Sequence, residues 1–317
     1  MTRRVAFLVL CAVCLLVAAL RGHAAEVTAE QSGQNVIVKI DGKLFTEYVV
    51  DNGPKPILWP IIGPTGKPMT RAYPMVEGDP TEREDHRHHR SLWFTHDDVN
   101  GEHFWHENKD HAVEKHRKYV KVESGEQAVI VAQTDWLGAD GKKVCEDERT
   151  ITFGTAGNDA RWIDYRITIK ATEGPVKFGD TKEGTMGIRV AGTMKQTAKP
   201  GGKIVNSEGQ IDKDAWGKRA AWVDYHGPVD GQTVGVAVLN HPSSFRFPTY
   251  WHVRTYGLFT ANPFGVRAFT RAPNADGSYT IPAGGSLTMR HRFLFHKGDE
   301  KAGKVAEAFA AYAKQKD

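Results

Sequence analysis

Histidine is concentrated in one part of the chain, and this concentration is the strongest indication of chemistry in the sequence. Of 14 histidines, eight lie in one stretch: His86, His88, His89, His96, His103, His106, His111 and His116. Imidazole exchanges protons near neutral pH and binds metal ions such as Zn²⁺. Trp93, Phe94, Phe104 and Trp105 lie in the same stretch, and aromatic rings commonly line ligand sites. This loop-like segment therefore predicts a site for proton transfer or ligand binding.

The geometry of this segment leaves two interpretations open. If residues 86–89 are extended, His86 and His88 share one face of the chain, while Arg87 and His89 take the other. Such a face fits a two-histidine metal site and a grip on a substrate anion equally well. If a divalent metal ion is bound, we expect its ligands among His86, His88, His103 and His106; the sequence indicates no other cofactor. A solvated polar loop with scattered histidines is the plainer alternative.

Two further segments carry groups that could complete such a site. Residues 240–265 are rich in proline and aromatic residues, which excludes a plain central strand, and they contain Asn240, His241, Trp251, His252, Arg254 and Asn262. Irregular segments of this kind often form binding sites, although a structural loop is the alternative. Residues 178–191 place Glu183 shortly before a predicted strand with Arg189. A desolvated carboxylate there could act as a general base, and a surface salt bridge is equally expected.

Short β-prone runs separated by turn residues must position these groups. Residues 35–40 and 43–50 flank Asp41-Gly42, which predicts a hairpin with a type I′ turn. Further runs occupy residues 119–122, 128–136, 149–153, 161–170, 187–191, 220–225, 233–239 and 286–295. Several alternate apolar and polar residues, and no helical pattern separates them, which favours an antiparallel all-β sandwich. An alanine-rich helix is predicted at 299–316, packed on the sheet as a lid, and residues 26–317 are expected to form one domain.

The first 25 residues differ from the rest of the chain. Arg3 and Arg4 precede an apolar run over residues 5–20, and small residues follow at Ala24 and Ala25, as in a secretory signal peptide. A periplasmic or secreted location is therefore expected. Without this segment the chain has 39 basic residues (42 less three) against 38 acidic ones, which excludes nucleic-acid binding by bulk charge. No later apolar run is long enough to span a membrane, and Cys145 is left as the one thiol.

Several motifs carry a resemblance to known families. They are residues 88–94 with 99–101, residues 182–184 with Arg189, residues 240–242, residues 251–254 and residues 262–265. Together they resemble an uncharacterised bacterial family labelled PmoA-like or "methane oxygenase", from about residue 30 to 298. Membership would imply a secreted β protein that is often found with sugar-degrading neighbours.

A weaker similarity is to galactose-mutarotase-like proteins, which implies a super-sandwich whose open groove binds sugar rings. A mutarotase uses a late glutamate as base, but residues 240–298 contain only one acid, Asp276. Glu183 is the candidate for that role.

The leading hypothesis is an extracytoplasmic carbohydrate-active protein with a sugar or sugar-acid substrate, of epimerase, lyase or hydrolase type. Proton transfer is assigned to His88, His89, Glu183, His241 and His252, with Glu183 as base. Substrate binding is assigned to Arg87, Trp93, Trp105, Arg189, Asn240, Trp251, Arg254 and Asn262, the arginines holding anionic or hydroxyl groups and the tryptophans stacking on the ring. A histidine-ligated metal enzyme and a non-catalytic glycan-binding module remain alternatives.

Overall fold

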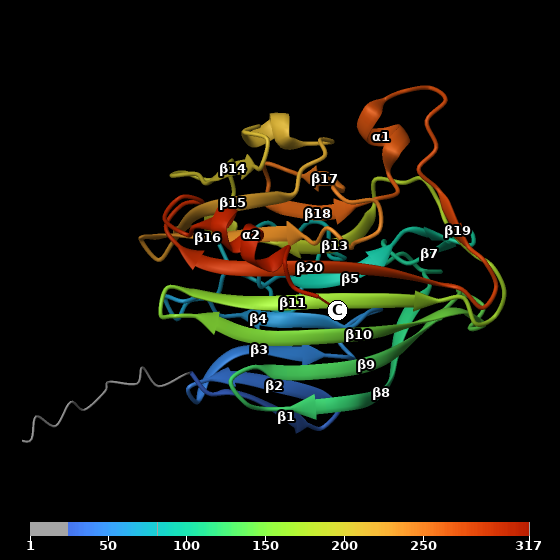
Figure 1. Ribbon diagram of the computed structural model, residues 1–317, viewed down its shortest axis with the longest axis horizontal. Helices are drawn as coiled ribbons and strands as arrows, with labels where there is room; N and C mark the ends of the chain where they lie inside the picture. The colour runs from blue at the N-terminus through green and yellow to red at the C-terminus, as the bar shows by residue number, and fades with distance from the viewer. Residues whose placement is uncertain (1–24, 81, 317) are drawn as a thin grey trace, which may run out of the picture.

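The computed structural model describes residues 25–80 and 82–316, which form an all-β antiparallel sandwich with a short C-terminal helix (Figure 1). The fold class predicted from the sequence is confirmed. Two eight-stranded sheets face each other, and a four-stranded sheet lies at one end of them. The predicted signal peptide lies outside the described residues, apart from Ala25. In the part of the chain that the structure describes, no helix is long and apolar enough to cross a membrane.

The first sheet has the order β1 (Val27–Ser32), β2 (Asn35–Ile40), β3 (Lys43–Val49), β4 (Ile57–Ile61), β5 (Leu92–His96), β13 (Gly184–Arg189), β18 (Leu258–Asn262) and β17 (Tyr250–Val253). The second has the order β14 (Lys203–Asn206), β15 (Trp222–Val229), β16 (Gln232–Asn240), β20 (Ser286–Lys297), β11 (Ala160–Lys170), β10 (Lys143–Ala156), β9 (Ala128–Leu137) and β8 (Val113–Glu123). The small sheet has the order β19 (Tyr279–Ile281), β12 (Val176–Phe178), β6 (Asp98–Val99) and β7 (Glu102–His103). The helices are η1 (Gly192–Met194), η2 (Asp212–Ala215), α1 (Val266–Thr270) and α2 (Val305–Tyr312).

The predicted Asp41-Gly42 turn connects neighbouring strands. Asp41 and Gly42 have φ values of 48° and 72°, and the flanking Ile40 and Lys43 pair directly. Two successive positive φ angles are those of the type I′ turn, which matches the twist of the strands it joins. The hairpin at 35–50 is therefore confirmed.

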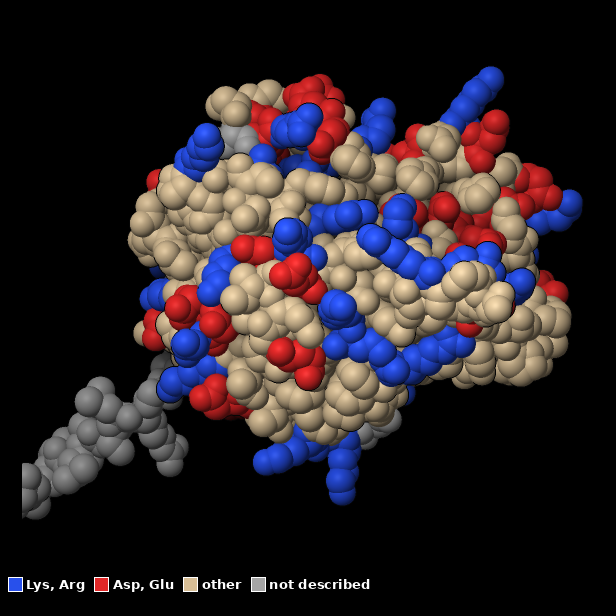
Figure 2. All heavy atoms as spheres, turned by 90° about the horizontal axis from the view of Figure 1, so that it is seen from above, with Lys and Arg blue, Asp and Glu red and all other residues tan. Residues whose placement is uncertain are grey.

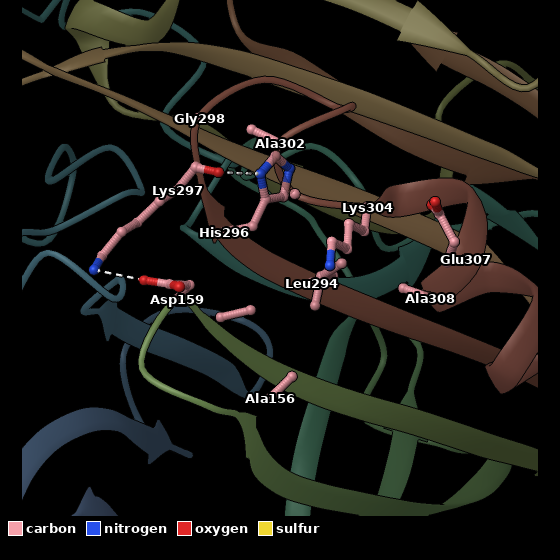
Figure 3. Close-up of a pocket in the computed structure, with 12 residues that line it drawn as sticks. Ala156, Asp159, Leu294, His296, Lys297, Gly298, Ala302, Lys304, Glu307 and Ala308 are labelled. Atoms are coloured by element: carbon pink, nitrogen blue, oxygen red, sulfur yellow. Dashed lines mark hydrogen bonds and ion pairs between the residues drawn. The ribbon is translucent and has the colours of Figure 1, made fainter.

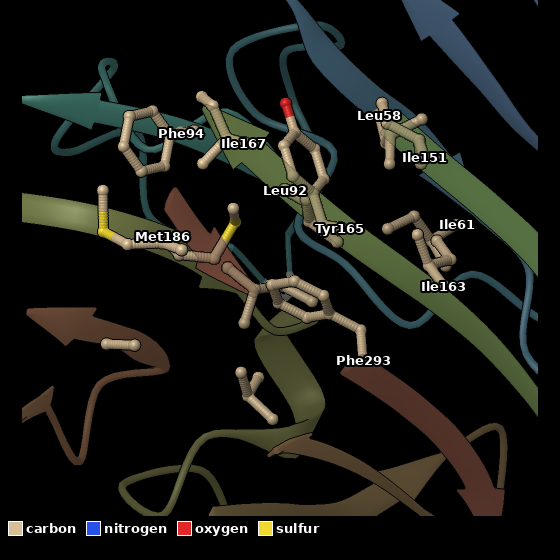
Figure 4. Close-up of a cluster of buried hydrophobic side chains, with 14 of the residues drawn as sticks. Leu58, Ile61, Leu92, Phe94, Ile151, Ile163, Tyr165, Ile167, Met186 and Phe293 are labelled. Carbon is tan, nitrogen blue, oxygen red and sulfur yellow. The ribbon is translucent and has the colours of Figure 1, made fainter. Parts of the chain in front are cut away.

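The core lies between the two large sheets (Figure 4). Leu92 and Phe94 of β5 point towards Ile163, Tyr165 and Ile167 of β11, as the period of two in each strand requires. These side chains are at most 2% exposed. Cys145 is also buried in this core, and burial raises the pKa of its thiol. Because the inner faces form the core, residues at the alternate positions point away from it.

The C-terminal helix is shorter than predicted. It begins at Val305 rather than at residue 299, because Lys304 adopts the left-handed conformation, with φ of 50°. Val305 and Tyr312 pack with Leu239 and Leu294 on the outer face of the second sheet, so the predicted lid is confirmed. Figure 1 shows α2 lying over β16 and β20.

Two further segments differ from the prediction. Residues 86–89 are not extended but form a turn, because His86 has φ of 46° and the His89 amide donates to the His86 carbonyl over 2.9 Å. Residues 92–96 in the same histidine-rich segment form β5, a fully buried strand within the first sheet. Residues 240–265, predicted to be irregular, contain the strands β17 and β18.

Candidate active site

A line of side chains crosses the outer face of the first sheet. Strand pairing places Trp93 of β5 beside Gly187 of β13, Gly187 beside Thr260 of β18, and Thr260 beside His252 of β17. A Cβ atom on Gly187 would lie 2.9 Å from the Trp93 ring and 3.0 Å from Thr260. The glycine therefore leaves room for the Trp93 indole to lie across β13.

Four rings are stacked on one another above this line. His89 stacks on Trp93 with ring centres 5.5 Å apart, and His86 stacks on His89 at 5.0 Å. Tyr256 completes the stack at 5.4 Å from His86. The turn at residues 86–89 makes this possible, because it places the His86 ring over the ring of His89, three positions later. The stack extends from the buried sheet face to a side chain, His86, that is 42% exposed.

Buried arginines hold this turn in place. Arg189 is 2% exposed, and its Nη1 lies 3.1 Å from His89 Nδ1 while its Nη2 lies 3.3 Å from Asp85 Oδ1. Arg71 donates to the same Asp85 oxygen over 3.0 Å and to the His86 carbonyl over 2.8 Å. The Arg189 guanidinium also lies 4.6 Å from the centre of the Tyr256 ring. Arg189 thus fixes the ring of His89, and Arg71 fixes the backbone of His86.

The two histidines in the centre of the cluster are neutral at ordinary pH. Burial, with the nearby positive charge of His106, lowers the pKa of His88 to about 3. Burial and the adjacent His88 hold the pKa of His89 well below its usual value. Because Arg189 can only donate, His89 Nδ1 accepts, which leaves the proton of that ring on Nε2. Neither group is a proton donor of ordinary acidity, but both can form hydrogen bonds.

His106 differs from these two histidines. Its ring centre is 4.7 Å from that of His88, and its Nδ1 lies 3.5 Å from Asp97 Oδ1. The Asp97 carboxylate raises the pKa of His106, and burial only partly opposes this effect. His103 approaches the same Asp97 oxygen at 3.5 Å, from a more exposed position. His106, 41% exposed and paired with a carboxylate, is thus the imidazole of this cluster most suited to give up a proton to a ligand.

Glu183 lies next to Asp97. The Asp97 amide donates to the Glu183 carbonyl over 2.9 Å, which holds the end of β5 against the start of β13. The Glu183 carboxylate pairs with Lys182 and lies 4.0 Å from His252 Nδ1. An acid candidate, His106, and a carboxylate base candidate, Glu183, therefore lie near the place where the end of β5 meets the start of β13.

His252 has a supporting position. Its Nε2 accepts from Arg254 Nε over 3.0 Å, so its proton is on Nδ1, which donates to the Lys182 carbonyl over 2.9 Å. Burial lowers the pKa of His252 to about 4, although the Glu183 charge acts in the opposite direction. The ring is 2% exposed. It therefore positions the backbone before Glu183 rather than meeting a ligand.

The structure brings together eight of the residues predicted for catalysis or binding: His88, His89, Trp93, Trp105, Glu183, Arg189, His252 and Arg254. Of these, His89, Trp93, Trp105, Arg189 and His252 are buried below the surface. The reachable groups are His88, Glu183 and Arg254, to which the structure adds His86, His106 and Tyr256.

Three residues predicted for the site lie away from this cluster: Asn240, His241 and Trp251. His241 is on the side of the second sheet, where its Nε2 lies 3.1 Å from the Gln315 carbonyl and its ring contacts Tyr312. Asn240 donates to His291 Nε2 over 3.2 Å. Trp251 is fully buried in the core, with Nε1 donating to the Ala220 carbonyl, so it cannot stack on a ligand.

Asn262 and Arg87 have other roles. Asn262 accepts hydrogen bonds from the Phe264 and Gly265 amides and donates to the Thr181 carbonyl over 2.9 Å. It therefore shapes the chain before Glu183 instead of binding a substrate. Arg87 is 63% exposed, and its Nε lies 3.6 Å from Glu107 Oε2.

The conditional metal ligands do not form a converged set. Among the described residues, ligand atoms of three residues lie within 4.8 Å of one another at one group, Asp224, His226 and Glu300. His86 and His88 instead pack by ring contacts, and His103 and His106 both face Asp97.

Asp97 and Tyr256 were not predicted as functional residues. Asp97 directly follows the buried strand β5, and Tyr256 stands two positions after Arg254 in a short turn between β17 and β18. A polar or aromatic residue just beyond the end of a strand can indicate a functional site. Asp97 and Tyr256 follow β5 and β17, but the sequence pattern does not reveal these two strands.

Residues 35–310 match a family described as "Family of unknown function (DUF6807)". No curated protein matches the chain. Among solved structures, the chain is similar to heparan sulfate lyase HepC from Pedobacter heparinus, with 10% identity, a TM-score of 0.37, and coverage of 87% of this chain and 36% of that one. It is also similar to a glycoside hydrolase family 97 enzyme from Pseudoalteromonas sp. strain K8, with 8% identity, a TM-score of 0.25, and coverage of 85% and 33%. The chain thus spans about a third of the length of these structures.

Proposed function

Since the chain belongs to DUF6807, a family of unknown function, we propose its activity from the site itself. The proposal is a carbohydrate-active protein in which His106 acts as acid and Glu183 as base on a sugar or sugar-derived substrate. The observation that carries it is the hydrogen bond between the Asp97 amide and the Glu183 carbonyl, because it places the partner of His106 beside Glu183.

The chemistry needs one group that gives a proton and one that takes it. In this proposal Glu183 accepts a proton from a carbon, a hydroxyl group or a water molecule, and His106 donates its proton to the oxygen that gains electrons. This pair of transfers serves an epimerase, a lyase or a hydrolase, depending on which bond of the substrate breaks. General acid–base catalysis of this kind contributes about 10²- to 10⁴-fold in rate.

A substrate with many hydroxyl groups fits the groups around this pair. His88 is neutral and accepts or donates hydrogen bonds, and Lys182 and Arg254 donate them. The His86 and Tyr256 rings stack on each other, so His86 offers its polar ring edge beside these donors rather than a free face. Sugars present many hydroxyl groups, so hydrogen-bonding groups that lie side by side suit them.

The finer expectations from the sequence belong to the same proposal. They are export through an N-terminal signal peptide to the periplasm or the medium, a single domain over residues 26–317, and a relation to the PmoA-like and galactose-mutarotase-like proteins. No nucleic acid is proposed as a partner, and Figure 2 shows acidic and basic side chains interspersed on the face that it presents.

A turnover screen with matched variants tests the proposal. The purified protein is incubated with plain and oxidised glycosides, and epimerisation, elimination and cleavage are followed by proton NMR. His106→Gln and Glu183→Gln are each expected to lower the rate at least about 100-fold. The controls are His111→Gln, in the same segment, and Glu126→Gln, at an exposed position. They are expected to keep the wild-type rate.

Equal turnover in the wild type and in both site variants would contradict the assignment. Saturable sugar binding without turnover would instead support the non-catalytic glycan-binding alternative.

A further inference from the structure

A second cluster of titratable side chains lies on the outer face of the other sheet. Asp224 and His226 are two positions apart in β15 and therefore point to the same side. Strand pairing places His226 beside Gly235 of β16, and Gly235 beside His296 of β20. Glu300 reaches the same place from the turn that follows β20.

Gly235 allows the cluster to form. A Cβ atom there would lie 2.2 Å from the His296 ring and 3.1 Å from Asp224 Oδ2. Because glycine has no Cβ, the His296 side chain crosses over β16 and reaches Asp224 of the next strand. Gly303 has the same effect from the other side, where a Cβ would lie 2.2 Å from His296 Nδ1.

The four side chains are closely packed and largely removed from solvent. His226 Nδ1 lies 2.7 Å from Asp224 Oδ1 and 3.6 Å from Glu300 Oε2. His296 Nε2 lies 2.7 Å from the other Asp224 oxygen. Asp224 is fully buried, His296 is 1% exposed, and the side chains of His226 and Glu300 are 11% and 15% exposed. Two carboxylates are thus held within reach of one imidazole nitrogen, and His226 and Glu300 keep a small exposed fraction.

We propose that Asp224 Oδ1, His226 Nδ1 and Glu300 Oε2 bind one divalent transition-metal ion of the Zn²⁺ type. These three atoms lie within 4.8 Å of one another, and imidazole nitrogen and carboxylate oxygen are ligands that Zn²⁺ takes at about 2.0–2.2 Å. In a tetrahedral site two such ligand atoms are about 3.3 Å apart, a value between the observed 2.7 and 3.6 Å. Small rotations of the two carboxylates therefore complete the site.

Proton balance and the supporting residue follow from the contacts. Binding replaces the proton on His226 Nδ1, which leaves to solvent, and the carboxylates bind as anions. His296 Nε2 donates to Asp224 Oδ2, the oxygen that does not meet the metal, and so orients the carboxylate. Three protein ligands leave one position for water.

The site is separate from the candidate active site and lies beside the cavity shown in Figure 3, which His296 also lines. That cavity has a volume of about 680 Å³ and is lined by His296, by the turn residues Gly298, Ala302 and Gly303, and by part of α2. Glu300 belongs to the same turn. A metal ion bound by Glu300 and β15 would therefore hold the turn that lines the cavity, and the start of α2, against the second sheet.

The experiment uses the full chain without a histidine tag, first treated with a chelator and then titrated with Zn²⁺ by calorimetry. We expect one Zn²⁺ per chain, a higher thermal midpoint with Zn²⁺, and visible absorption bands when Co²⁺ replaces it. Glu300→Gln and His226→Asn are expected to weaken Zn²⁺ binding at least about 10-fold and to reduce the thermal shift. Glu307→Gln, an exposed residue lining the same cavity, and His111→Gln are the controls and are expected to bind as the wild type does.

Asp224 is left unchanged because its substitution could prevent folding, and folding of the two variants is checked by circular dichroism. Binding of less than about a tenth of an equivalent would overturn the proposal and leave a hydrogen-bonded cluster without a metal. Undiminished binding in both Glu300→Gln and His226→Asn would also overturn it, since the ion would then lie elsewhere.

Discussion

Glu114 is a buried carboxyl group whose ionisation is expected to destabilise the protein as pH rises. It lies at the start of β8, 2% exposed, and its Oε2 is 2.5 Å from Arg149 Nη2. Arg149 in turn binds both oxygens of Asp147. The Glu114 amide donates to the Pro54 carbonyl over 2.7 Å. The Glu114 side chain thus belongs to a buried ionic cluster with Arg149 and Asp147, and its backbone joins β8 to the chain at Pro54, next to Lys55.

Burial raises the pKa of Glu114 from 4.5 to about 7, and Arg149 opposes this only in part. A carboxyl group with a raised pKa in the folded state contributes stability that is fully present below the unfolded value of 4.5. That stability is lost as pH rises towards 7. With 1.36 kcal/mol per pKa unit, the loss between pH 5 and pH 8 is about 2.5 kcal/mol.

The perturbation is Glu114→Gln, which keeps the shape of the protonated acid and cannot ionise. The free energy of unfolding is measured by urea denaturation at pH 5 and pH 8 for the wild type and the variant. Relative to the wild type, the variant should gain about 2.5 kcal/mol between the two pH values. Glu126→Gln, at an exposed position of the loop between β8 and β9, is the control and should follow the wild type. A constant difference between Glu114→Gln and the wild type would show that Glu114 does not ionise with a raised pKa in the folded protein.

Three further predictions concern the candidate active site. Asp97→Asn should lower the pKa of His106, because the carboxylate that raises it is lost; NMR titration measures this, and an unchanged pKa would contradict the pairing. Trp105→Ala should cost about 3–5 kcal/mol of unfolding free energy, because the indole is 1% exposed and packs on Trp93; a urea-measured loss below about 1 kcal/mol would speak against that packing. Gly187→Ala should cost about 1–3 kcal/mol and change the near-ultraviolet circular dichroism, since its Cβ would displace Trp93; an unchanged spectrum would show that the ring does not lie there.

The parts of the fold that the sequence predicted correctly have strong local signals. The hairpin at 35–50 has an Asp-Gly turn between two apolar runs, and β11 matches its predicted run within one residue. The strands β5, β17 and β18 were missed because histidine, tryptophan and asparagine mask their alternation. In these strands both faces are covered, one by the core and the other by the site, so they lack the polar face that marks a half-buried strand.

Local sequence patterns do not contain the geometry of the candidate site. The structure places Arg189 beside His89 of the histidine-rich segment, and the Asp97 amide of the same segment donates to the Glu183 carbonyl. The turn at His86 depends on a positive φ angle and on contacts with Arg71 and Arg189, which lie far away in the sequence. His241 was assigned to the same site, although β16 carries it to the second sheet. Such long-range placement follows from sheet order, which local patterns do not contain.

The second sheet illustrates the same limit. Asp224, His226, His296 and Glu300 are separated by up to 76 positions, and none forms a recognisable motif in the sequence. Only the pairing of β15, β16 and β20, with a glycine in the middle strand, brings them together.

Histidine NMR during sugar titration shows whether a sugar binds beside His106 and Glu183, because it reports where a ligand binds without requiring turnover. The protein is labelled with ¹³C at the histidine Cε1 position and titrated with the plain and oxidised glycosides. We expect the signals of His86, His88 and His106 to shift while those of His241 and His291 stay in place. Shifts confined to His241 and His291, or no shift with any of these sugars, would contradict it.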